Sequence, residues 1–179
     1  MYSMRRTETT LWQPLAGIVV CCVLGWFAFV REVNVPVLAL ADLGVHELGH
    51  LLTYVFPDVV TAMAGSILQI AVPWALAGYF LAVRREVLGG VFCLAWAGTS
   101  AQNASVYVAD APYEALPLIG GSHDWAFVLG PESFDVLHRA AEIAGVVRLG
   151  GLVLLLNALV ICVVAIAVRP TAQRRAVTA

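Results

Sequence analysis

Four stretches of this chain carry no charged side chain over the length of a membrane-crossing helix. They are residues 11–30, 59–83, 87–109 and 149–168. A helix that crosses the hydrocarbon core of a bilayer needs about 20 mostly apolar residues. A fifth run, residues 35–56, is as long but contains Asp42, His46, Glu47 and His50. The sequence therefore predicts an all-α, polytopic membrane protein with five transmembrane helices, the charged run being the second.

The composition supports the same class and excludes others. Hydrophobic residues make up 61% of the 179 residues and charged residues 12%, against roughly 45–50% and about 25% in soluble domains. A soluble chain of this size could not cover so much apolar surface. The net charge is −2 and all ten basic residues are Arg, so the basic surface of a nucleic-acid-binding protein is missing. We expect one integral membrane domain over residues 1–179, with the lipid bilayer as its solvent.

The arginines predict how this domain is oriented. With one crossing for each run, the N-terminus and an extramembrane loop, residues 110–145, share one side of the membrane. Arg31, Arg84, Arg85 and the arginines after residue 168 lie on the other side. The positive-inside rule makes that second side cytoplasmic and the loop extracytoplasmic, although Arg5 and Arg6 act against this assignment. The Ala-, Val- and Arg-rich composition favours a bacterial inner membrane.

The charged run contains the motif His46-Glu47-Leu48-Gly49-His50. Residues i and i+4 share one face of a helix, so both imidazoles can bind one metal ion. The HExxH pattern is typical of zinc sites in which the Glu acts on a metal-bound water. Ionisable side chains in a membrane helix cost several kcal/mol, and a bound metal would relieve that cost. The alternative is an amphipathic surface helix with solvated His and Glu, but leucines on all sides of the run favour burial.

A polytopic chain with HELGH in its second apolar run resembles the site-2 protease family of intramembrane zinc metallopeptidases. The resemblance rests on His46, Glu47 and His50 and on the membrane context. It implies that the two histidines bind Zn²⁺ and that Glu47 is the general base. It also implies an aspartate ligand in a later span, within an Asn-Pro…Asp-Gly motif. This chain has no Asp-Gly, and Asn103 with Asp110 are the nearest counterparts.

A catalytic zinc site needs a third protein ligand and one open position. We expect this ligand from the Gly-Gly-Ser-His-Asp-Trp segment, residues 120–125, with His123 preferred because imidazole suits zinc and Asp124 as the other choice. One of the two would bind the metal while its neighbour orients a ligand, and Trp125 would anchor the segment at the membrane interface. The alternative is a solvated loop with a helix N-cap at Ser122 or Asp124.

Asp110 and His138 are weaker candidates for the third ligand. Asp110 is more easily explained as an interfacial acid at the end of a span, and His138 as part of a surface helix. Asp42 stands one turn before His46, so it either orients that imidazole or pairs with an Arg.

The uncharged polar side chains Gln69, Gln102 and Asn103 are costly in lipid. They either form hydrogen bonds between helices or contact the reacting water and the substrate backbone.

These features predict an intramembrane zinc metallopeptidase that hydrolyses peptide bonds of a membrane-associated protein or peptide substrate. The alternative is a non-catalytic zinc-binding membrane protein, such as a sensor, an accessory subunit or a metal carrier. A fourth protein ligand that closes the metal would favour this alternative. A structural membrane protein without metal is the third possibility.

Overall fold

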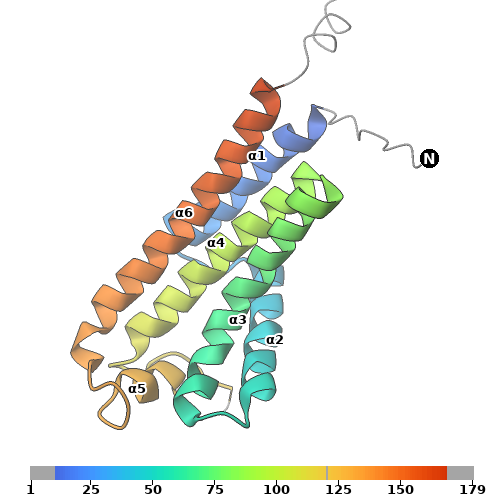
Figure 1. Cartoon of the computed structure of the whole chain (residues 1–179). Coiled ribbons are helices and arrows are strands. Elements are labelled where there is room, and N and C mark those ends of the chain that lie inside the picture. Colours follow the sequence, from blue (N-terminus) through green and yellow to red (C-terminus); the bar gives the residue numbers. More distant parts are fainter. Residues whose placement is uncertain (1–10, 120, 169–179) are drawn as a thin grey trace, which may run out of the picture.

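The computed structural model of this protein describes residues 11–119 and 121–168, which fold into helices and connecting turns without a β-strand (Figure 1). In chain order the elements are α1 (Trp12–Gly25), the π-helical turn η1 (Trp26–Val30), α2 (Pro36–Thr53), α3 (Asp58–Gly78), the π-helical turn η2 (Tyr79–Arg84), α4 (Val87–Asp110), α5 (Asp124–Leu129), the 3₁₀ turn η3 (Leu137–Arg139) and α6 (Ala140–Ala167). The predicted all-α class is confirmed. The central helix α4 packs against α1, α3 and α6.

Three helical stretches in the described part of the chain are long and apolar enough to cross a membrane. They are Trp12–Val30, Asp58–Arg84 and Leu137–Ala167. The helices α2 and α4, which the sequence also predicts as spans, carry more polar side chains and are not among these three. The last stretch begins well before residue 149, because η3 leads directly into α6 and extends the helix into the predicted loop.

Helices α1 and α2 both run in the same direction as α4 (Figure 1). Along α1, Gly17 faces Val91 near the start of α4, and along α2 the carboxylate of Asp42 contacts Ser100 farther along α4. The prediction of one crossing per run, which needs α1 and α2 to be antiparallel, is therefore wrong. The linker between α1 and α2 does not reverse the direction of the chain. It contains Glu32, whose φ is 52°.

In this arrangement the start of α1 lies at the end of the bundle where η2 meets α4, opposite α5 (Figure 1). The sequence had predicted it on the same side as the loop of residues 110–145. Arg84 and Arg85 lie at the junction of η2 and α4. Arg5, Arg6 and the arginines after residue 168, which the orientation argument also used, lie outside the described residues.

Within residues 11–119 and 121–168, buried apolar side chains form two separate cores. The first lies among α1, α4 and α6 and is formed by buried side chains that include Cys21, Leu24, Val91, Leu155 and Cys162. We call the part of the bundle around it the apolar half.

The second core joins α3, α4, α5 and the start of α6. Its buried side chains include Ala62, Val108, Trp125, Val128 and Ala140. We call this part, together with α2, the site half. Within the predicted loop 110–145, α5 is docked onto the bundle by Trp125, which is 9% exposed and donates a hydrogen bond from Nε1 to Ser66 Oγ over 2.9 Å. Trp125 is thus a core residue, not the interfacial anchor that the sequence suggested.

Candidate metal centre

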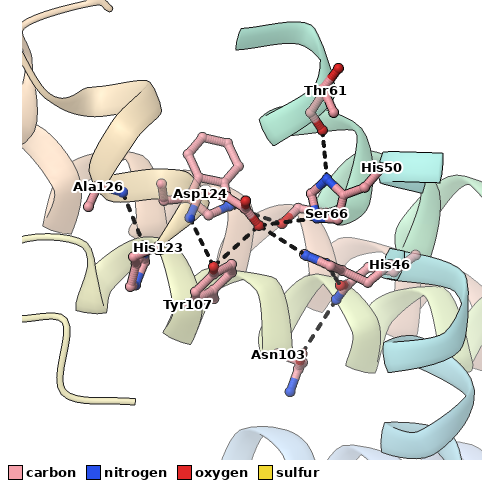
Figure 2. A network of polar contacts seen from close by, with 11 residues as sticks. His46, His50, Thr61, Ser66, Asn103, Tyr107, His123, Asp124 and Ala126 are labelled. Carbon is pink, nitrogen blue, oxygen red and sulfur yellow. Dashed lines mark hydrogen bonds and ion pairs between the residues drawn. The ribbon is translucent and has the colours of Figure 1, made fainter. Parts of the chain in front are cut away.

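The two histidines of the motif on α2 meet Asp124, the first residue of α5 (Figure 2). His46 Nε2 lies 3.2 Å from Asp124 Oδ2, and His50 Nε2 lies 3.3 Å from the same oxygen. All three ligand atoms lie within 4.8 Å of one another. Helix periodicity places the two rings one turn apart, edge to face, with their centroids separated by 4.8 Å and their planes at 73°.

A hydrogen bond to Gln69 determines which nitrogen of His46 carries the proton. Gln69 Nε2 donates to the carbonyl oxygen of Ser100 over 3.1 Å and faces Asn103 Oδ1 at 3.4 Å. The amide oxygen of Gln69 is therefore the atom that faces His46 Nδ1, at 2.9 Å. Because that oxygen only accepts hydrogen bonds, Nδ1 of His46 must donate. In the neutral ring, Nε2 then presents its lone pair to Asp124.

His50 is oriented in the same way by the backbone. Its Nδ1 lies 2.8 Å from the carbonyl oxygen of Thr61 in α3, which also can only accept. The neutral ring of His50 therefore directs the lone pair of Nε2 toward Asp124 Oδ2 as well. Two imidazole lone pairs and a carboxylate oxygen converge, and this is electrostatically unfavourable unless a cation or extra protons lie among them. Histidines that bind a metal through one ring nitrogen typically donate a hydrogen bond from the other, as both of these histidines do from Nδ1.

The donor set fits zinc, and two of its three separations are close to those of a tetrahedral site. At bond lengths of about 2.0–2.2 Å, ligands at the corners of a tetrahedron lie about 3.3–3.6 Å apart. The two His-to-Asp separations, 3.2 and 3.3 Å, are close to this spacing. Two imidazoles and one carboxylate are a ligand set of catalytic zinc sites, which keep a further position for water or substrate.

Two glycines let α2 approach α3 closely enough to build this centre. A Cβ on Gly65 would lie 2.6–2.7 Å from atoms of the His46 ring, so the imidazole occupies the space that a side chain would fill. A Cβ on Gly49, inside the motif, would lie 2.6 Å from the carbonyl oxygen of Ala64. The close helix contact therefore depends on both residues.

Tyr107 of α4 contacts Asp124 through its hydroxyl group. The Tyr107 hydroxyl donates to Asp124 Oδ2 over 3.2 Å and accepts from the backbone N–H of Asp124 over 3.0 Å. Together with the bond from Trp125 to Ser66, these contacts join the start of α5 to α4 and α3.

His123, the preferred third ligand on sequence grounds, is turned away from the group formed by His46, His50 and Asp124 (Figure 2). It caps α5, since its Nδ1 accepts a hydrogen bond from the N–H of Ala126 over 3.2 Å. Its Nε2 faces Asp110 Oδ2 at 3.4 Å, without hydrogen-bond geometry, and its side chain is buried. The structure thus brings Asp124, not His123, to the two histidines.

Asp110 organises the loop after α4 and lies outside the three-residue group. Its two carboxylate oxygens accept hydrogen bonds from the N–H groups of Ala115 and Leu116 over 3.2 and 3.0 Å. His138 lies in η3 with its side chain exposed to solvent, also apart from the group.

Asp42 joins α2 to α4 and does not orient His46 or pair with an Arg as expected. Its Oδ1 accepts hydrogen bonds from Trp96 Nε1 over 2.8 Å and from Ser100 Oγ over 2.5 Å. Asn103 forms bonds between segments, as expected for the uncharged polar side chains, and donates from Nδ2 to Asn34 Oδ1 over 2.7 Å. The buried Gln102 makes its contacts with Ser105 on its own helix.

The centre opens into a cavity of about 630 Å³, within the range of small-molecule sites. His46, His50 and Asp124 line it together with the exposed Glu47, the second residue of the motif. Apolar side chains form much of its wall, including Leu40 and Leu43 of α2, Val106 of α4 and the segment of residues 116–119. A second cavity of about 320 Å³ also reaches His50 and Asp124 and is lined by Asp58 and Thr61.

Three contributors to this centre were missed by sequence reasoning. Tyr107 is one of three aromatic residues in α4, and Gly65 is one of 15 glycines, so neither carries a distinctive signal. Thr61 contributes its backbone carbonyl, which no residue pattern reveals.

Comparisons with protein-family models, with curated proteins and with solved structures found no match to this chain.

Proposed function

We propose that this chain is a membrane-embedded zinc metallopeptidase, similar to the site-2 protease family, with His46, His50 and Asp124 as the metal ligands. One observation carries the proposal. Both imidazoles use Nδ1 as a hydrogen-bond donor, so their Nε2 lone pairs converge with a carboxylate oxygen at 3.2 and 3.3 Å. A bound cation turns this arrangement from repulsive to attractive.

Glu47 is the acid–base residue of the proposed reaction. A zinc ion would supply Lewis-acid polarisation of the scissile carbonyl and of the attacking water. Glu47 lies next to His46 in the motif and lines the same cavity as the three ligands. Its carboxylate takes one proton from the attacking water and later delivers it to the nitrogen of the leaving amine.

The proposed substrate is a segment of a membrane protein or a membrane-associated peptide. The apolar cavity wall favours hydrophobic side chains beside the scissile bond. A peptide bond in a helix is already paired within that helix, so the substrate segment has to be unwound before it is cleaved. The outward-facing side chains of α2, such as Leu51 and Leu52 at 66% and 61% exposure, are suited to contact with lipid.

We place the centre on the extracytoplasmic side of a bacterial inner membrane. Arg84 and Arg85 lie at the end of the bundle opposite α5 (Figure 1), and an excess of Arg favours the cytoplasmic side. A cysteine introduced at Ser122, in a chain whose exposed Cys22 is replaced by Ala, should react in intact cells with a membrane-impermeant thiol reagent. Arg85→Cys in the same background is the matched control and should react only after the cells are opened. The reverse pattern would contradict this orientation.

The experiment that tests the enzyme proposal compares the wild type with Glu47→Gln. Protein purified in detergent should contain one zinc per chain by elemental analysis and should cleave a quenched fluorescent peptide of apolar sequence. Glu47→Gln should retain the zinc and lose at least about a hundredfold in kcat, since general acid–base catalysis contributes about 10²–10⁴-fold. Glu132→Gln, at an exposed glutamate after α5, is the control and should match the wild type.

Three outcomes would contradict the proposal. Cleavage that persists in Glu47→Gln would exclude the role assigned to this carboxylate. Zinc binding without cleavage by the wild type would instead favour a non-catalytic zinc-binding membrane protein, whereas absence of zinc would favour a structural role.

A further inference from the structure

Tyr107 occupies a central position beside the proposed metal centre (Figure 2). Its ring lies between two histidines, with centroids 5.9 Å from His46 and 4.3 Å from His123. It also lines the 630 Å³ cavity, as does Glu47. The two side chains come from different helices, α4 and α2, and face the same space.

The Tyr107 hydroxyl has one proton to donate and lone pairs that accept. A lone pair accepts from the backbone N–H of Asp124 over 3.0 Å, while the proton points to Asp124 Oδ2 over 3.2 Å. If a cation binds that carboxylate oxygen, it withdraws electron density and weakens the hydrogen bond from Tyr107. The proton can then turn toward another acceptor by rotation about the C–O bond, while the N–H of Asp124 and the flanking rings keep the oxygen in place.

We propose that Tyr107 is a catalytic residue whose hydroxyl donates a hydrogen bond to the scissile carbonyl oxygen of the substrate as that oxygen becomes negatively charged. This inference rests on the function proposed above. Donors that are held in place before the reaction, and that point to where charge develops, are among the largest contributions to catalysis. Tyr107 meets this description because its hydroxyl oxygen accepts from the N–H of Asp124, lies 3.2 Å from Asp124 Oδ2 and belongs to a side chain that lines the cavity.

The proposed step is balanced without a change in the protonation of Tyr107. The oxygen of water forms a bond to the carbonyl carbon, the C=O π electrons move to the carbonyl oxygen, and one water proton passes to Glu47. The carbonyl oxygen accepts the hydrogen bond from Tyr107. When the carbonyl re-forms, the C–N bond breaks and Glu47 returns the proton to nitrogen.

The test uses Tyr107→Phe and a readout that does not depend on turnover. A phosphinic peptide has a tetrahedral phosphorus atom with two oxygens in place of the scissile carbonyl. It is titrated into the zinc-loaded, detergent-solubilised protein. We expect Tyr107→Phe to bind one zinc per chain and to bind the phosphinic peptide about a hundredfold more weakly. For the fluorescent peptide, kcat should fall by a similar factor while KM stays within about threefold. Tyr113→Phe, at a tyrosine that is 78% exposed, is the matched control and should leave all these values unchanged.

Two results would overturn the inference. Equal affinity of the wild type and Tyr107→Phe for the phosphinic peptide would show that the hydroxyl does not contact the reacting oxygen. Loss of zinc from Tyr107→Phe would show that the hydroxyl serves to hold Asp124 as a ligand. Failure of the proposed function would look different, because the wild type itself would then lack zinc or cleavage.

Discussion

In the apolar half, α4 and α6 come so close that a Cβ on Gly98 would lie 2.7 Å from the carbonyl oxygen of Gly151, and the reverse approach is 2.6 Å. In the site half, Gly49 and Gly65 also allow a close approach, but hydrogen bonds made by side chains additionally join α2, α3 and α4. Examples are the bonds from His46 to Gln69, over 2.9 Å, and from His50 to the carbonyl of Thr61, over 2.8 Å.

The two kinds of contact serve different purposes: close packing stabilises the fold, and hydrogen bonds orient the side chains of the candidate metal centre. Close packing of small residues holds helices together without polar groups, which suits an apolar environment. Directional hydrogen bonds orient imidazoles and carboxylates, but burying those polar groups is costly unless every partner is present. We therefore expect changes in the site half to act mainly on metal binding, and changes in the apolar half to act mainly on the free energy of unfolding.

The largest effect is expected from removing the third ligand. Asp124→Ala takes away the carboxylate on which the two imidazoles converge. The affinity for zinc should fall by about a hundredfold or more, because even residues that only support metal ligands are worth 10–100-fold. Competition with a chromophoric chelator measures this affinity. Glu132→Ala removes an exposed carboxylate as a control, and an equal effect in both variants would refute the assignment of Asp124.

A methyl group at Gly65 should weaken zinc binding without removing any ligand. The new Cβ of Gly65→Ala would lie 2.6–2.7 Å from the His46 ring and would displace that imidazole. We expect about a 10–100-fold loss of zinc affinity in the same competition assay, comparable to other changes in groups that orient ligands. Gly78→Ala is the control in the same helix, since open space surrounds that position. Unchanged zinc affinity in Gly65→Ala would mean that the His46 ring can move away from the new methyl group and still bind the metal.

The contrast between His123 and Asp124 shows which part of the candidate metal centre could be predicted from the sequence. The HExxH motif predicted that His46 and His50 lie together, because residues i and i+4 share one face of a helix. It could not choose between two adjacent candidates at the start of α5. The residue that caps the helix turns its side chain back to the backbone, as His123 does toward Ala126, while the next side chain points toward α2.

The directions of the helices are a second feature that the sequence could not predict. The apolar runs located the long helices of the described residues, since runs of that length leave few alternatives, although α6 begins at Ala140 and not at residue 149. Whether successive runs reverse depends on the backbone of a short linker, here the segment around Glu32, and its residue types do not determine that. The partners of Asp42 were equally hidden, because Trp96 and Ser100 lie more than 50 positions away in the chain.

In the apolar half, Gly98→Ala tests whether the two halves are energetically independent. The added methyl group forces α4 and α6 apart, and overpacking of this kind costs about 1–3 kcal/mol. Thermal or denaturant unfolding in detergent should show this loss. Gly145→Ala, in α6 with open space around it, is the control and should be neutral or slightly stabilising. Zinc affinity should stay at the wild-type value, and a marked decrease would show that the apolar half also positions the metal ligands.

The smallest effect is expected where the linker between α1 and α2 meets α6. Arg148 Nη1 lies 2.8 Å from Glu32 Oε1, with the two side chains 42% and 58% exposed. Exposed ion pairs contribute about 0–1 kcal/mol, so in detergent Arg148→Ala should lower the free energy of unfolding by less than about 1 kcal/mol and leave zinc affinity unchanged. The double variant with Glu32→Ala measures the coupling of the pair. A coupling well above 1 kcal/mol would mean that this ion pair, more than close packing, fixes the linker that lets α1 and α2 run in the same direction.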